Sequence, residues 1–225
     1  MSALSSAAVQ QVKMGHDFNQ VHYRMTDIHI SKTAAKREAR IAEILDCAEL
    51  QFVESGFHGA GISSIAKTCG ISVGHLYHYF ASKELLIEAV VERELMRQRE
   101  KLDDFRSLNA AEIREQIAPK VIDAIVNHQD PFRTVLNFEI LAEAQRNPAI
   151  ANILHKYDRE MREEFCNLLA KAGIGTPVMR TEMLFSLFAG IPARNLRHPE
   201  QERSQFIELM KPIITDILIG DDCSI

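Results

Sequence analysis

The segment from Ile65 to Phe80 is the feature that most constrains the fold, because it has the pattern of two short helices joined by a tight glycine turn. Ile65 and Ala66 give the first helix a short apolar face. Gly70 permits the left-handed backbone that ends a helix, and Ser72 can cap the helix that follows. Together these residues predict a helix-turn-helix.

The second helix of this unit is expected to start at about Val73 and to present two different faces. Leu76 and Phe80, four residues apart, form the face that anchors it to the body of the protein. Its first turns carry small or hydrogen-bonding side chains instead: Gly74, His75, Tyr77 and His78. Such a helix can enter a DNA major groove. Alternatively, the two histidines occupy a solvated surface or form half of a metal site; we expect no metal, because no third ligand has suitable spacing.

Length and composition indicate a soluble globular protein of one or two domains. The chain has 225 residues, of which 46% are hydrophobic and 25% charged, and it has no run of eighteen apolar residues that would span a membrane. The N-terminus lacks the basic start and apolar core of a secretory signal, so we expect a cytoplasmic protein. The scattered cysteines fit a reduced compartment rather than a disulfide framework or a zinc site: Cys47, Cys69, Cys166 and Cys223.

The formal net charge of −5 is unusual for a nucleic-acid binder, which commonly carries a basic surface. The positions of the cations matter more than their sum. Six of them lie where the first helix begins or on and beside the helix-turn-helix: Lys32, Lys36, Arg37, Arg40, Lys67 and Lys83. These side chains can face DNA phosphates on one surface of an acidic protein. The alternative is a solvated helix face whose cations pair with acidic residues three or four positions away.

The whole sequence predicts an all-α chain of about nine helices, because its segments have helical periodicity and none alternates as a strand does. Residues 1–32 lack a sustained period and are expected to form a flexible arm. The first helix should begin at about Thr33 and end at Gly56, and the fourth should link two domains. Capping side chains mark the starts of the fourth, sixth and seventh helices: Ser82, Asp130 and Asn147.

The span from about Lys36 to Leu86 resembles the DNA-binding domain of the tetracycline-repressor (TetR) family of transcriptional regulators. The resemblance rests on an ordered series: Arg37, Ile44, Ala48, Phe52, Gly56-Phe57, Ile65-Ala66, Gly70-Ile71-Ser72, Gly74, Leu76-Tyr77-His78-Tyr79-Phe80 and Ser82-Lys83-Glu84-Leu85-Leu86. So ordered a series is specific, whereas a lone Gly-x-Ser is not. The rest of the chain resembles the family only in size, helical content and helix lengths.

The resemblance implies three regions: an N-terminal arm (1–32, in which Met25 offers an alternative start), a helix-turn-helix DNA-binding domain (33–85), and a helical ligand-binding and dimerisation domain (86–221). It implies a homodimer that binds a palindromic operator in double-stranded DNA. It also implies that a small molecule in the C-terminal domain releases the DNA, so that the protein acts as a repressor. No cofactor is implied.

The DNA contacts of the family transfer position by position. The residues matching base-facing positions are Ser72, Val73, Gly74 and His75. The residues matching positions that touch phosphate or adjacent base edges are Tyr77, His78 and Lys83, and the basic cluster adds Lys36 and Arg37. An imidazole can donate to or accept from a base edge, and a glycine allows close approach, so His75 and Gly74 suit these roles chemically.

One departure from the family pattern lies where the second helix begins. Members commonly carry Thr or Ser there, and this chain has Ala60 and Gly61. A glycine caps a helix more weakly than a hydroxyl side chain does, and a phosphate contact is lost with the hydroxyl. Ser63 or Ser64 can take over that contact.

The last two predicted helices are apolar over a wider arc than packing on one core requires, so we expect a partner to cover the excess. Paired helices from two subunits would form a four-helix interface. The residues expected there are Phe185, Phe188, Phe206, Met210, Ile213 and Ile217. Alternatively, both helices are central core helices. In either case Pro212 is expected to kink the last one.

A ligand pocket is expected near the sixth helix, where Glu139 and Glu143 share a face with Phe132. Buried carboxylates there would select a cationic or hydrogen-bond-donating effector. We favour the alternatives that Arg133 or Arg146 neutralises them or that this face lies at the domain surface. Further candidates for a mainly apolar cavity are Met96, His128, Tyr157, Met161 and Phe165, and for each of them we favour ordinary packing.

Two other classes of function compete with a DNA-binding regulator. An all-helical enzyme has little support, because the chain contains no Gly-rich phosphate loop, no Gly-x-Ser-x-Gly and no His-Glu-x-x-His. A TetR-like adaptor that binds proteins, or an activator, is the other alternative, and the departure at Ala60 and Gly61 leaves it open. Salt-dependent, sequence-specific DNA binding would separate a regulator from an enzyme or an adaptor.

Overall fold

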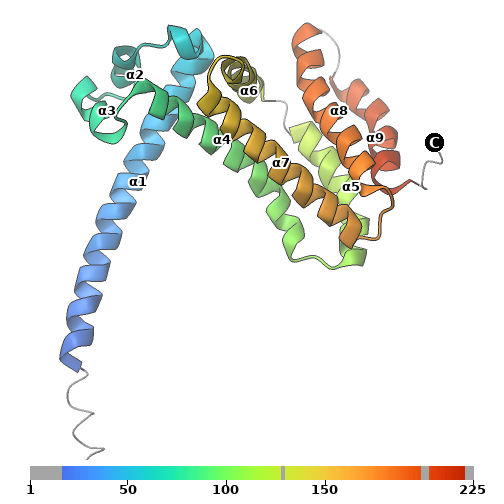
Figure 1. Ribbon diagram of the computed structural model, residues 1–225, viewed down its shortest axis with the longest axis horizontal. Helices are drawn as coiled ribbons and strands as arrows, with labels where there is room; N and C mark the ends of the chain where they lie inside the picture. Colours follow the sequence, from blue (N-terminus) through green and yellow to red (C-terminus); the bar gives the residue numbers. More distant parts are fainter. Residues whose placement is uncertain (1–16, 128–129, 199–202, 221–225) are drawn as a thin grey trace, which may run out of the picture.

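The computed structural model describes residues 17–127, 130–198 and 203–220, which form nine helices and, within these ranges, no strand (Figure 1). The all-α prediction is confirmed for these residues. No helix among them is long and apolar enough to span a membrane. The helices are α1 (Asp17–Gly59), α2 (Ile62–Thr68), α3 (Val73–Tyr79), α4 (Lys83–Arg106), α5 (Ala110–Asn127), α6 (Pro131–Ala144), α7 (Pro148–Lys171), α8 (Pro177–Arg197) and α9 (Arg203–Ile219).

Helix α1 begins at Asp17, so the prediction that helical structure starts at about Thr33 is wrong. The sequence from Asp17 to Ser55 contains neither glycine nor proline. Once a first turn has formed, nothing in this segment interrupts the propagation of backbone hydrogen bonds. The start of α1 projects away from the other helices as a long rod (Figure 1). Residues 1–16 of the expected arm lie outside the described residues, and the division into three regions stays a prediction.

Gly56 interrupts α1 at the position where the sequence predicts its end. Its backbone has φ 72° and ψ 164°, a conformation that essentially only glycine adopts. The chain then makes one further helical turn, and the kink directs Phe57 into the core, where its ring meets that of Phe52 edge-on at 4.8 Å between centroids. A Cβ atom at Gly56 would lie 3.2 Å from the carboxylate of Glu139 on α6.

Two clusters of buried hydrophobic side chains hold the helices together. The first joins α1, α2 and α3 to the first half of α4, to α6 and to the start of α7. The second joins the end of α4 to α5, the second half of α7, α8 and α9. Helices α4 and α7, each 24 residues long and packed against each other, take part in both clusters. The helix-turn-helix therefore shares its core with α6 and α7.

The predicted capping residues begin their helices through side-chain hydrogen bonds. Ser82 Oγ accepts from the backbone N–H of Leu85 at 3.2 Å, at the start of α4. Asp130 and Asn147 accept in the same way at the starts of α6 and α7, each before a proline at the first helical position. These three caps are confirmed, and they fix the first residues of α4, α6 and α7.

We expect Gly56→Ala to lower the free energy of unfolding by about 1–3 kcal/mol, because an alanine is strained at this backbone conformation. Chemical denaturation followed by circular dichroism measures the change. Gly59→Ala is the matched control, since Gly59 is helical and a Cβ there would lie at an ordinary 3.5 Å from Ser55. The control should change stability by less than about 1 kcal/mol. Equal losses in both variants would contradict the assigned role of the kink.

Candidate DNA-binding interface

Helix α3 presents the two faces that the sequence predicts. Ser72 Oγ accepts a hydrogen bond from the backbone N–H of His75 at 3.1 Å and so caps the helix. Leu76 is fully buried and Phe80 nearly so, and these two side chains anchor α3 on the core. The opposite face is open to solvent over Ser72, Val73, Gly74, His75, Tyr77 and His78. The exposed face therefore consists of side chains that can contact base edges or phosphates.

Tyr79 joins α3 to the basic cluster in the middle of α1. The guanidinium of Arg37 lies over its ring, 5.9 Å from the centroid. The rings of His75 and His78 lie 5.5 and 5.3 Å from the same ring. Arg37 is thus held close to α3, and Lys36, its neighbour in the sequence, is exposed as well.

The start of α2 lacks the hydroxyl cap that is common in the family, as the sequence predicts. Gly61 is the N-cap and makes no side-chain cap hydrogen bond. The Ser64 hydroxyl donates to Oε1 of Gln51 on α1, so it already has a partner within the protein. Ser63 is exposed, and its hydroxyl is the better placed of the two for a phosphate.

Lys83, at the start of α4, also has a partner within the protein. Its Nζ donates to the backbone carbonyl of His58 at 3.3 Å, and the residue is half-buried. This contact ties α4 to the kinked end of α1. Helices α2 and α3 lie at one end of the molecule and α8 and α9 at the other, so the candidate interface is remote from the last two helices (Figure 1).

The carboxylates of Glu139 and Glu143, expected near a ligand, are directed at α1. Glu139 Oε2 accepts from the backbone N–H of Phe57 at 3.3 Å. Glu143 Oε2 lies 3.0 Å from Nε2 of His58, and its Oε1 accepts from Asn147. The expectation that an arginine, Arg133 or Arg146, neutralises them is therefore wrong, because the kinked end of α1 supplies backbone and imidazole partners instead. This arrangement gives no support to a cationic effector.

The other ligand candidates are placed along α4, α6 and α7 and are not gathered at one point. Met96 is exposed, and Phe132 is half-buried beneath the guanidinium of Arg133 at 5.2 Å. The Tyr157 hydroxyl donates to Oε1 of Gln98 at 3.4 Å, and burial raises the pKa of Tyr157. The remaining two, Met161 and Phe165, are buried side chains of α7, and His128 lies outside the described residues.

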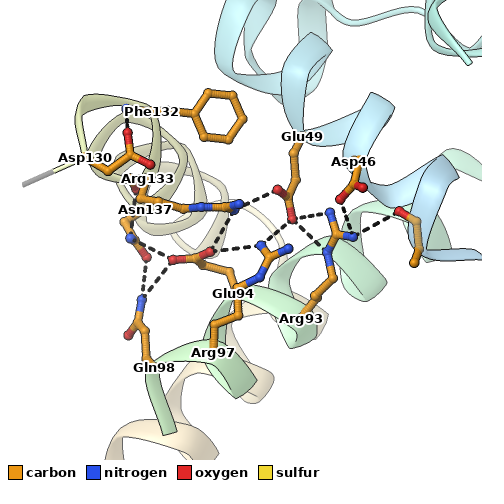
Figure 2. A network of polar contacts seen from close by, with 11 residues as sticks. Asp46, Glu49, Arg93, Glu94, Arg97, Gln98, Asp130, Phe132, Arg133 and Asn137 are labelled. Atoms are coloured by element: carbon orange, nitrogen blue, oxygen red, sulfur yellow. Dashed lines mark hydrogen bonds and ion pairs between the residues drawn. The ribbon is translucent and has the colours of Figure 1, made fainter. Parts of the chain in front are cut away.

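A polar network between α1, α4 and α6 is the feature that the sequence interpretation missed (Figure 2). At its centre are two carboxylates, Glu49 and Glu94, which are 2% and 3% exposed. A signal was present, because Glu49 follows Leu45 by four positions and Glu94 follows Val90 by four. Helical periodicity therefore places both carboxylates on apolar faces. The partners of these carboxylates are Arg93, Arg97, Arg133 and Asn137.

No group of three or more His, Cys, Asp or Glu side chains with a geometry suited to a metal ion occurs among the residues that the structure describes. His75 and His78 instead pack around Tyr79.

Comparison with known proteins identifies both parts of the chain. Residues 44–90 match the family described as bacterial regulatory proteins, tetR family, and residues 112–218 match the tetracyclin repressor-like C-terminal domain. The HTH-type transcriptional regulator UidR of Escherichia coli K12 is 38% identical over 117 residues, which cover 49% of this chain and 55% of UidR. The match thus spans about half the length of that relative.

Two further relatives cover more of their own length. The HTH-type transcriptional regulator BetI of Paraburkholderia phymatum is 30% identical over 148 residues, which cover 60% of this chain and 69% of BetI. The structure of Salmonella enterica GusR superimposes with a TM-score of 0.61 at 26% identity, covering 80% of this chain and 95% of GusR. These matches place the chain among regulators rather than enzymes: it belongs to the TetR family of transcriptional regulators.

Proposed function

We propose that the protein is a ligand-responsive transcriptional repressor, which binds a palindromic operator as a homodimer and leaves it when a small molecule binds the helical domain. The observation that carries this proposal is the capped, exposed face of α3 beside Lys36 and Arg37. Two such helices about 34–36 Å apart would enter successive major grooves. Release would require a coupling between the ligand and DNA sites, which is typically about 1–3 kcal/mol.

The roles proposed at the DNA follow from exposure and partners. Four residues at the start of α3 face bases: Ser72, Val73, Gly74 and His75. Tyr77, His78, Lys36, Arg37 and Ser63 are exposed and face phosphates or adjacent base edges. Ser64 and Lys83 bind other parts of the protein, so they act mainly by holding α2 and α4 against α1.

Selection of bound fragments from genomic DNA at two salt concentrations tests the proposed function. Each phosphate neutralised by a cation releases counterions, so binding of a regulator weakens steeply as salt rises. We expect one palindromic sequence to be enriched, with an affinity that falls at the higher salt concentration. Absent or salt-insensitive enrichment would contradict the proposal and favour an adaptor that binds proteins.

We expect His75→Ala to weaken binding to the selected operator by about 1–3 kcal/mol, roughly 5- to 150-fold, because a lost base contact removes discrimination. Fluorescence anisotropy with the operator and with a scrambled duplex measures both affinities. Lys36→Ala is the control for a phosphate contact. It should weaken binding to both duplexes alike and reduce the salt slope by about one. If the His75 variant distinguished the operator from the scrambled duplex as well as the wild type does, His75 would not be a base contact.

The proposed dimer interface lies on α8 and α9, where apolar side chains remain exposed in the single chain. Leu209 is 70% exposed and Ile213 49%, and Met183 on α8 is also exposed. The expected interface residues Phe185, Phe188, Phe206 and Met210 are half-buried, and pack against the second cluster of their own chain. Ile217 is buried within that cluster, so we remove it from the proposed interface.

Leu209→Glu should convert the dimer to a monomer at micromolar concentration, because a partner helix would have to desolvate the new carboxylate. Sedimentation equilibrium measures the mass of the species. Leu141→Glu is the control, since Leu141 is an equally large, exposed apolar side chain on α6. A wild-type protein that is monomeric, or a Leu209 variant that remains dimeric, would contradict the proposed interface.

A further inference from the structure

Glu49 on α1 is shared between two helices (Figure 2). Its Oε1 accepts hydrogen bonds from Nε of Arg93 and Nη1 of Arg97, each at 2.8 Å and each from α4. Its Oε2 accepts from Nη1 of Arg133, on α6, at 2.7 Å. One oxygen of a single buried carboxylate is therefore held by α4, and the other by α6.

The attachment of α4 to α1 has several contacts and does not depend on Glu49 alone. Arg93 Nη1 also donates to Oδ1 of Asp46 at 2.8 Å and to the backbone carbonyl of Ala42 at 3.1 Å. Its side chain is 17% exposed. Together with the shared hydrophobic cluster, these contacts make the first half of α4 and α1 one packed unit.

Helix α6 reaches the same carboxylate through Arg133, whose Nη1 lies 3.1 Å from Oε2 of Glu94 as well. Asn137, one turn further along α6, donates to Oε1 of Glu94 at 3.3 Å and accepts from Gln98 at 2.9 Å. These amide contacts join α6 to α4 without α1. The contact between Arg133 and Glu49 is thus the step of the network that links α6 to the helix of the DNA-binding unit.

The contact between Arg133 and Glu49 is costly to break because Glu49 is buried. A carboxylate that is 2% exposed loses much of its stabilisation if one of its cationic partners withdraws, because water cannot replace the partner. Near the other end of α6, Glu139 and Glu143 bind the kinked end of α1 at Phe57 and His58. A displacement of α6 must therefore displace α1 with it or leave buried charge unpaired.

We propose that Arg133 couples α6 to the DNA-binding helices: through Glu49 it transmits a change in the position of α6 to α1 and so to the recognition helix α3. The inference rests on the proposed binding of an operator. It assigns the buried ionic link between the two helices to Arg133 and to a carboxylate 84 positions away in the sequence, whereas Glu139 and Glu143 hold the other end of α6 against α1. Because such coupling is reciprocal, DNA bound at α3 must then change the stability of α6.

Amide hydrogen exchange of α6, residues 131–144, measured with and without the selected operator duplex, tests this link and needs no effector. In the wild-type protein, we expect the operator to slow exchange in α6 about fivefold or more. Arg133→Met should still bind the operator but should lose this slowing. Arg133→Lys should restore it, because the lysine cation can pair with Glu49. Arg146→Met is the matched control on the exposed turn after α6 and should behave as wild type.

Arg133→Met leaves the buried charge of Glu49 without its α6 partner. The double variant Glu49→Gln, Arg133→Met removes that charge and is measured beside the single variant. The glutamine oxygen can still accept a hydrogen bond from Arg93 or Arg97. Circular dichroism confirms that the variants fold. Operator-induced slowing that persists in the folded methionine variants, or is absent from the wild type although it binds the operator, would overturn the link alone. Failure of the wild type to select any operator would overturn the proposed function as well.

Discussion

The burial of Glu49 between arginines of α4 and α6 is the polar interaction that joins α1 to both of these helices. Buried carboxylates are costly unless each oxygen is paired, and here the pairing uses two different helices. The same region contains the apolar cluster that joins α1, α2 and α3 to α4, α6 and α7. The helix-turn-helix is consequently held by its neighbours in the bundle rather than attached only at the start of α4.

The second apolar cluster lies at the opposite end of the molecule from α3 (Figure 1). It packs α5, α8 and α9 against the far halves of α4 and α7, well away from α3. Buried Arg180 on α8 donates to the backbone carbonyls of Asp216, Ile217 and Gly220 and so fixes the end of α9 against α8. Helices α4 and α7 take part in both clusters. A partner subunit on α8 and α9 would therefore lie near one end of this helix pair, and a DNA duplex on α3 near the other.

Local sequence signals predicted the features that depend on neighbouring residues, and failed where distant residues decide. Gly56, Ser72 and Ser82 act through their own turns, so the kink and both caps were predictable. The partners of Glu139 come from α1, 82 positions earlier, and no periodicity names them. The early start of α1 was missed because the absence of breakers, rather than a periodic apolar face, decides it. Ile217 was assigned to a partner because helical periodicity cannot tell which of several neighbouring helices covers an apolar stripe.

Hydroxyl-radical footprinting of the protein on its selected operator tests the central claim, that two copies of α3 read one DNA duplex, most directly. The account predicts two protected patches related by a two-fold axis, on one face of the duplex and about one helical turn, 34–36 Å, apart. A single protected patch, or protection without symmetry, would contradict it.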